Sequence, residues 1–252
     1  MRIYRIKLNG KIIFAKSSKN SEELIPIDKI ISKNLQRKID IKKANILPPI
    51  VPNRIFGIAQ NYKGVGGRRV NKPIIFFKSP SSIVRNNINI KIPKFIIKNK
   101  LKFWGEPELG FIIKKRIPIN SKINTKCIFG YLICNDITFS NKFNNDHHLP
   151  ISKSIDKTFP ISDFINTEFN LKGKNIYSIH NKKIHRRGVL DNMIYKPIEI
   201  IRILNKYFEL NRGDLIMSGA PPRIKKRTYI KKNDSYECFI DELGSIKNLF
   251  CY

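Results

Sequence analysis

The chain has 252 residues, 41% of them apolar, which predicts a globular protein with one large core and excludes a disordered chain. No apolar run reaches the ~18 residues that span a bilayer, and the N-terminus lacks an apolar stretch of signal-peptide length. The four cysteines are scattered without C-x-x-C spacing and are expected to be reduced. These features together predict a cytoplasmic protein with no membrane partner.

The net charge of +30 and the pI of 10.1 would ordinarily suggest nucleic acid as a partner. However, 47 Ile and 35 Lys against 4 Ala and 5 Val indicate A/T-rich coding, as in an intracellular symbiont, so the lysine excess is expected to be spread over the surface. The densest cluster, RIKKRTYIKK at 223–232, has no RNA-binding aromatic signature. We therefore expect no specific nucleic-acid partner. The positive field should still attract small anionic substrates.

The first 45 residues predict a small N-terminal domain. Asn9-Gly10 within LNGKIIF is a hairpin signal, and the polar stretch 21–39 predicts a helix. ILPPIVPN at 46–53 holds three prolines and reads as a linker into a second domain at 46–252.

Residues 46–252 predict a mainly β, α+β domain in which turn residues separate short, largely antiparallel strands. One helix is expected over 196–208, where Pro197 precedes apolar residues at helical spacing. The expected strands cover 54–59, 74–78, 109–115, 127–136, 168–172, 176–180, 183–187, 215–219 and 237–241.

Two glutamates stand two residues apart in FWGEPELGF, so a strand would present Glu106 and Glu108 on one face. Two such close carboxylates repel unless a cation lies between them, and Asp136 at the end of an apolar strand offers a third. Hard cations such as Mg²⁺ or Ca²⁺ take oxygen ligands of this kind. From the pattern alone, a solvated strand end whose glutamates pair with lysines is the better supported interpretation.

From residue 46 onward the chain resembles the fumarylacetoacetate hydrolase family, in its short bacterial form with a small N-terminal domain. The resemblance depends on the order of seven segments over about 200 residues. These segments are ILPPIVPNRIFGIAQNY, KPIIFFKSPSSIV, EPELGFII, GYLICNDIT, KSIDKTFPI, MIYKPIEIIRILNKYFELNRGDLIMSGAPP and NDSYECFIDELGSIKN.

The resemblance implies a mixed β-roll with few helices, a homodimer, and Mg²⁺ (or Mn²⁺ or Ca²⁺) held by Glu106, Glu108 and Asp136. It also implies an enzyme acting on a small anionic β-keto or enol acid: hydrolysis of acylpyruvates, decarboxylation of oxaloacetate or isomerisation of hydroxymuconate-type diacids. Lys153 matches the family's catalytic lysine, which adds positive charge beside a developing enolate. The substrate-binding positions that match are Gln60, Tyr62, Ser218 and Gly219.

Several family positions are altered. The His and Glu that activate water in the family become Val65 and Arg68, an arginine becomes Gln60, and a threonine becomes Ala220. The Arg-Asp-x-Gln that follows the third ligand in the family becomes SNKF at 140–143. These losses support the alternative of a degenerate family protein that keeps the metal site and serves a binding or structural role.

Other residues of the loop and the histidines add little to the missing base. Gly64, Gly66 and Gly67 give mobility, and Arg68 and Arg69 are candidates to clamp a carboxylate. We expect the histidines to be solvated; these are His147, His148, His180 and His185.

Overall fold

A computed structural model describes residues 1–17, 21–27, 38–65 and 73–252. The predictions for Gly66, Gly67, Arg68 and Arg69 fall outside these ranges. Within the described part of 21–39 the predicted helix is wrong, because residues 23–26 form a strand in which Leu24 is buried and Ile25 exposed. That alternation lets the strand cover the small N-terminal core, which a helix of this composition would not do.

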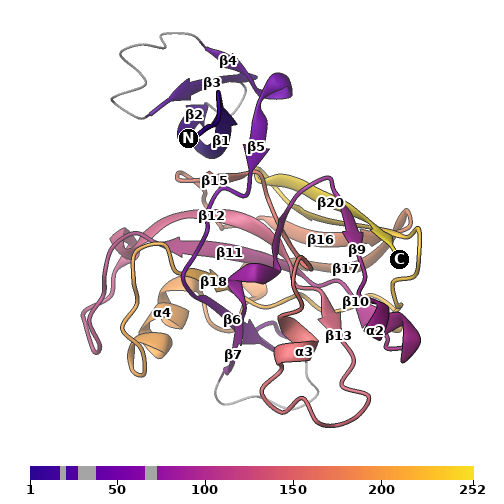
Figure 1. Cartoon of the computed structure of the whole chain (residues 1–252). Coiled ribbons are helices and arrows are strands. Elements are labelled where there is room, and N and C mark those ends of the chain that lie inside the picture. The colour runs from indigo at the N-terminus through magenta and orange to yellow at the C-terminus, as the bar shows by residue number, and fades with distance from the viewer. Residues whose placement is uncertain (18–20, 28–37, 66–72) are drawn as a thin grey trace.

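The N-terminal strands form a small unit beside the body of the molecule (Figure 1). The predicted Asn9-Gly10 turn is confirmed: both residues have positive φ, 48° and 80°, as a two-residue hairpin loop requires. The unit's own apolar cluster includes Tyr4, Ile6 and Leu24. Its strands are β1 (Arg2–Leu8), β2 (Lys11–Ser17), β3 (Glu23–Pro26), β4 (Ile39–Asp40) and β5 (Asn45–Leu47). Because β5 still pairs with β1, the boundary at residue 45 stays a prediction.

A large sheet runs from the N-terminal unit through the body, since β1 pairs with β15 and the order continues β12, β11, β18, β6, β7. Its pairs are antiparallel except β18 with β6 and β14 with β8. The remaining strands of this sheet are β6 (Ile55–Ala59), β7 (Ile74–Lys78), β8 (Ile83–Arg85), β11 (Pro107–Ile113), β12 (Ile128–Asn135), β14 (Phe159–Ile161), β15 (Phe164–Asn166) and β18 (Leu215–Met217).

A second sheet lies against the first, in the order β17, β16, β19, β20, β9 (Figure 1). The largest apolar cluster fills the space between the two sheets and includes Leu109 and Ile133 from the first and Tyr236 and Ile246 from the second. The strands of the second sheet are β9 (Asn89–Lys91), β16 (Asn175–His180), β17 (Lys183–Val189), β19 (Ser235–Ile240) and β20 (Gly244–Cys251). A separate short pair joins β10 (Phe103–Trp104) to β13 (Thr138–Phe139).

Three short α-helices lie in the described ranges: α2 (Lys94–Lys98), α3 (Pro150–Lys153) and α4 (Pro197–Asn205). Helix α4 begins at the predicted proline, and Glu199 accepts a hydrogen bond from the Lys196 amide at 2.7 Å, which satisfies a free N–H of the first turn. Its apolar face packs on Phe56 and Phe111. The α-helix ends at residue 205, three residues before the predicted end.

The predicted mainly β, α+β fold is confirmed. The strand expected over 168–172 is wrong: β15 ends at 166, and the chain then turns toward β16. Among the described residues, Cys127, Cys134, Cys238 and Cys251 carry free thiols, as predicted. No helix in the described ranges is long and apolar enough to cross a membrane.

Candidate metal centre and adjoining cavity

Three carboxylates meet where two neighbouring strands end. Glu106 immediately precedes β11, Glu108 lies in it, and Asp136 follows β12. The strands are antiparallel, and the Asp136 amide donates to the Glu106 carbonyl at 2.8 Å. One oxygen from each side chain lies within 4.8 Å of the others. We call these three residues the acid cluster.

The acid cluster is buried. Asp136 is 0% exposed, Glu108 is 2% exposed, and the Glu106 side chain is 17% exposed. The interpretation of this stretch as a solvated strand end is therefore wrong, because the antiparallel pairing carries both glutamates under neighbouring elements. The expected pairing of glutamates with cations is partly right, since buried cations surround two of the three acids.

Lys153, at the end of α3, lies among the acids. Its Nζ is 2.5 Å from Asp136 Oδ2, 3.2 Å from Glu106 Oε2 and 2.6 Å from Thr138 Oγ1. Burial alone would lower the pKa of Lys153, but the carboxylates of Asp136 and Glu106 more than offset burial and hold that pKa above its ordinary value. Lys153 therefore stays cationic and is an electrostatic group, not a base.

Two further cations were missed at the sequence level. Lys78, fully buried at the end of β7, donates from Nζ to Asp136 Oδ1 at 2.8 Å and to the Lys153 carbonyl. Arg186 in β17 donates to Glu106 Oε1, which also accepts from the Trp104 indole at 3.1 Å. In a chain with 35 lysines, neither position stands out; the apolar run IIFF before Lys78 is the only signal that could have found it.

The glutamates have opposite electrostatic environments. Burial alone would raise the pKa of Glu106, but the charges of Lys153 and Arg186 lower that pKa to about 2. Burial and the neighbouring Asp136 charge raise the pKa of Glu108 well above its ordinary value. No salt bridge to Glu108 occurs within the described ranges, and its Oε2 accepts from the Gly219 amide at 2.7 Å. Glu108 is thus the acid whose charge is left unbalanced.

A divalent cation fits this donor set. All three candidate ligands are carboxylates, which suit Mg²⁺, Mn²⁺ and Ca²⁺, and a bound ion would balance the charge of Glu108. Lys153 approaches the same oxygens from one side, so an ion would share the acids with this ammonium group.

A cavity of about 260 Å³ opens beside the acid cluster. Gln60 and Lys153 line it, and so do Val65 and Ala220, the positions where family side chains are lost. The other residues expected to bind substrate lie behind this wall: Tyr62 and Ser218 are 0% exposed, their hydroxyls have no partner among the described residues, and Gly219 binds Glu108. The substrate-binding roles of these residues stay predictions.

The histidines differ among themselves. His147 and His148 are exposed, as expected. The expectation of a solvated His185 is wrong: its side chain is buried in β17, and its Nδ1 lies 2.8 Å from the Tyr236 hydroxyl. His180 is partly buried between Thr228 and Asp234. None of the four lines the cavity beside the acid cluster.

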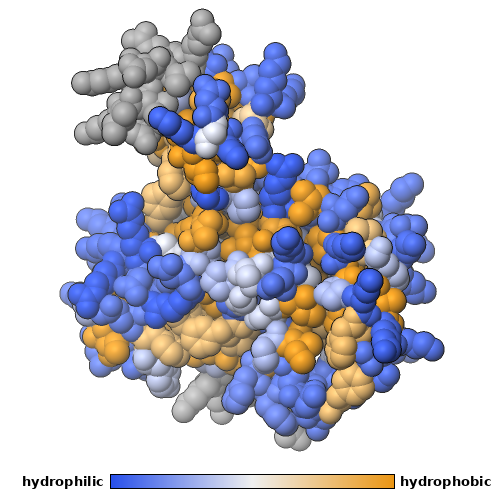
Figure 2. Space-filling model, in the orientation of Figure 1, coloured by the Kyte–Doolittle hydropathy of each residue, from blue (hydrophilic) through white to orange (hydrophobic). Residues whose placement is uncertain are grey.

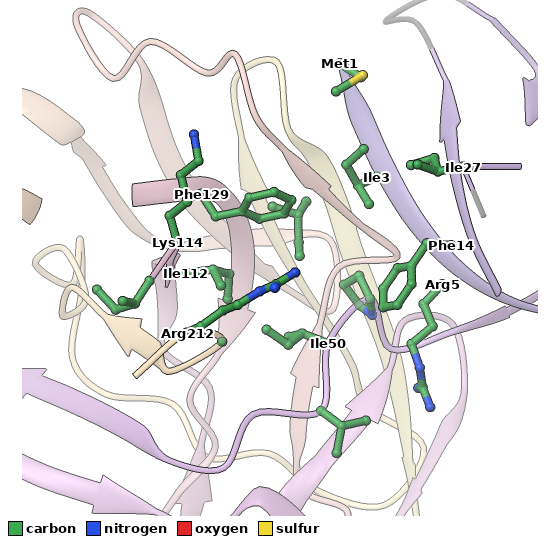
Figure 3. A pocket seen from close by; sticks show the side chains of 15 residues that line it. Met1, Ile3, Arg5, Phe14, Ile27, Ile50, Ile112, Lys114, Phe129 and Arg212 are labelled. Carbon is green, nitrogen blue, oxygen red and sulfur yellow. The ribbon is translucent and has the colours of Figure 1, made fainter. Parts of the chain in front are cut away.

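A larger cavity, of about 840 Å³, lies between the N-terminal strands and the body, where apolar side chains gather (Figures 2 and 3). Phe14 and Ile27 face Ile50 and Ile112 across it, and the Arg212 side chain extends into it (Figure 3). Its described lining contains no carboxylate, so this cavity offers no oxygen ligands for a cation.

The fold and the acid cluster agree with the comparison to known sequences. The family sequence model described as "Fumarylacetoacetate (FAA) hydrolase C-terminal" matches residues 54–250. The chain therefore belongs to the fumarylacetoacetate hydrolase family.

Individual relatives are more distant. An uncharacterised protein of Staphylococcus aureus (strain USA300) is 29% identical over 223 residues, which cover 83% of this chain and 73% of that protein. The structure of 5-carboxymethyl-2-hydroxymuconate delta-isomerase from Mycobacterium smegmatis superposes with a TM-score of 0.84 at 19% identity, covering 100% of this chain and 98% of that one. Maleylpyruvate hydrolase from Sphingobium sp. SYK-6, in complex with manganese(II) and pyruvate, gives a TM-score of 0.78 at 17% identity, covering 100% and 99%. At these identities the two structures establish the shared fold.

Proposed function

We propose that this protein is a divalent-metal-dependent enzyme acting on a β-keto or enol acid. The observation that carries the proposal is the convergence of three carboxylate oxygens within 4.8 Å, with Glu108 facing no described cation. The family membership and the manganese in the maleylpyruvate hydrolase structure support it. The reaction classes proposed are carbon–carbon hydrolysis of an acylpyruvate, decarboxylation of oxaloacetate, and isomerisation of a hydroxymuconate-type diacid.

The chain's own groups have distinct roles in this proposal. Glu106, Glu108 and Asp136 would hold Mg²⁺, Mn²⁺ or Ca²⁺, and a bound ion supplies Lewis-acid polarisation of a keto oxygen. Lys153 stays protonated beside the acids, so it stabilises negative charge that develops on the substrate. Gln60 lines the cavity and can hydrogen-bond a substrate oxygen.

The cavity favours chemistry that needs no water-activating base. Besides the three acids, its lining offers cations, an amide and apolar groups, with Val65 and Ala220 at two altered family positions. Within the described lining, no histidine or further carboxylate is placed to take a proton from water. This supports decarboxylation or isomerisation over hydrolysis.

The proposal is tested by turnover of oxaloacetate, an acylpyruvate and a hydroxymuconate-type diacid with Mg²⁺ or Mn²⁺, before and after chelation. Glu108→Gln keeps the shape of the side chain and removes its charge, and we expect it to lower turnover at least about a hundredfold and to weaken Mn²⁺ binding. Glu22→Gln, on an exposed N-terminal glutamate, is the matched control and should change neither. Turnover that is indifferent to both chelation and Glu108→Gln would refute the proposal.

A second candidate is a degenerate family member that binds metal without efficient catalysis. The neutralisation of Glu106 and Asp136 by Lys78, Lys153 and Arg186 favours it, because these cations compete with an ion for the same oxygens. Calorimetric titration with Mn²⁺ together with the turnover assays separates the candidates. Stoichiometric binding without turnover of any of the three substrate classes would support this second function.

A further inference from the structure

Four cations of the segment Arg223–Arg227 surround a second cavity, of about 360 Å³, next to the acid cluster. We call this segment the basic segment. Its cavity shares four lining residues with the cavity beside the acids, so the two compartments have a common wall. The shared residues are Val65, Arg186, Arg223 and Arg227.

The positive charge of this second cavity is unbalanced. Its described lining contains five cations and no acid. Arg186 is neutralised by Glu106, but no salt bridge or hydrogen bond to a carboxylate joins Arg223, Lys225, Lys226 or Arg227 within the described ranges. Burial, together with the charges of Arg227 and Arg186, lowers the pKa of Arg223, as crowded cations do.

The arginines of the basic segment are held in place by the fold. The backbone of Arg223 bridges to Arg186 in β17, and on either side the Arg187 amide donates to the Pro222 carbonyl and the Ile224 amide to the His185 carbonyl, at 3.3 and 3.1 Å.

At the other end of the basic segment, the Arg227 guanidinium lies 3.9 Å from the ring centre of Trp104. The indole of Trp104 donates to Glu106. The basic segment is thus attached to the acid cluster through one side chain.

A lysine-rich surface explains scattered cations but not this arrangement. Lysines spread by coding bias are expected to point into solvent singly, whereas these cations share a concave lining with a buried arginine of the acid cluster. Oxyanions bind where several Arg and Lys donors converge, through charge-assisted hydrogen bonds.

We propose that Arg223, Lys225, Lys226 and Arg227 form a subsite for a second oxyanionic group of the substrate, carboxylate or phosphate, while its keto-acid end lies at the acid cluster. The inference rests on the proposed function for the position of the keto-acid end. It narrows the substrate to a molecule with anionic groups at both ends, and it assigns the RIKKR sequence a ligand-binding role.

The test compares two triple variants that remove the same charge. Arg223→Gln/Lys225→Gln/Lys226→Gln neutralises three cations of the basic segment and leaves Arg227 on Trp104. Lys114→Gln/Lys115→Gln/Arg212→Gln neutralises three exposed cations that do not line either compartment of the site. Any effect of overall charge is therefore the same in both.

The first measurement is calorimetric binding of inorganic phosphate at physiological salt, which needs neither metal nor turnover. We expect the basic-segment variant to bind phosphate at least about tenfold more weakly than the unmodified protein, because charge-assisted contacts are lost. The control variant should stay within about twofold. Equal weakening in both variants, or none in either, would overturn the subsite.

The second measurement compares kcat/KM for maleylpyruvate, which has two carboxylates, with that for acetylpyruvate, which has one. A loss of about tenfold in this selectivity in the basic-segment variant alone identifies the bound group as a carboxylate. Weakened phosphate binding with unchanged selectivity identifies it as a phosphate. If no keto acid is turned over, the proposed function fails, and phosphate binding still decides the subsite.

Discussion

The acid cluster and the basic segment Arg223–Arg227 share a wall but are stabilised in opposite ways. Two of the three acids are buried and ion-paired, and their positions are fixed by β11, β12 and the ends of β7 and α3. The cations of the basic segment are exposed and have no carboxylate partners among the described residues. A charge that the fold has already balanced contributes to stability, whereas an unbalanced charge at the surface is available to a ligand.

The largest effect is expected from breaking the acid side of this comparison. Lys78→Met removes a fully buried ammonium and leaves Asp136 with one cation in place of two. We expect the free energy of unfolding to fall by about 4 kcal/mol, since a buried charge loses its partner. Urea denaturation measures this loss. Lys42→Met, at an exposed ion pair, should have almost no effect, and equal effects of the two substitutions would contradict the comparison.

Between the acid cluster and the basic segment lies His185. Its burial, with the charges of Arg186 and Arg223, lowers its pKa from 6.5 to about 4. Because the unfolded chain binds a proton at higher pH than the folded protein, the contribution of His185 is complete above about pH 6.5 and is lost as the pH falls toward 4. The loss amounts to at most about 3 kcal/mol.

The pH dependence is checked by urea denaturation between pH 7 and 4 on the unmodified protein and on His185→Gln. The difference between the two curves isolates this residue from the many carboxylates that titrate in the same range. Curves that stay parallel over the whole interval would show that the imidazole is not held neutral.

A smaller effect is expected where the backbone supports the acids. Gly219 has φ of +88°, and an added Cβ would lie 2.7 Å from the Ile58 carbonyl oxygen, while its amide donates to Glu108. Gly219→Ala should therefore cost about 2 kcal/mol of unfolding free energy and weaken Mn²⁺ binding, because the amide moves away from the carboxylate. Gly173→Ala, also at positive φ but with open space around it, controls for backbone strain alone and should leave Mn²⁺ binding unchanged.

The smallest effect on stability is expected on the basic side. Arg223→Gln should change the free energy of unfolding by less than about 0.5 kcal/mol, because the side chain is exposed and has no carboxylate partner among the described residues. The same substitution should raise the pKa of His185, measured by NMR titration, since a neighbouring positive charge is removed. A marked loss of stability would mean that the basic segment is structural.

Local patterns predicted much of the fold. Asn9-Gly10 predicted its hairpin because few other dipeptides adopt two positive φ values, and Pro197 predicted the start of α4 because its missing N–H costs nothing there. The stretch 21–39 misled, because its polar composition hid the alternating burial that makes Glu23–Pro26 a strand. The stretch 168–172 misled in the opposite sense, since β-forming residues there lie in a turn.

The sequence by itself determined the family, the strand-rich fold and the three acids of the candidate metal centre, because strand alternation and a run of ordered motifs are local properties of the chain. Only the tertiary structure decided which cations meet those acids. Lys78, Lys153 and Arg186 come from β7, α3 and β17, and nothing local distinguishes them from the other lysines and arginines of a chain with net charge +30. Their partners are set by which strands lie side by side, and so is the unbalanced charge of the basic segment.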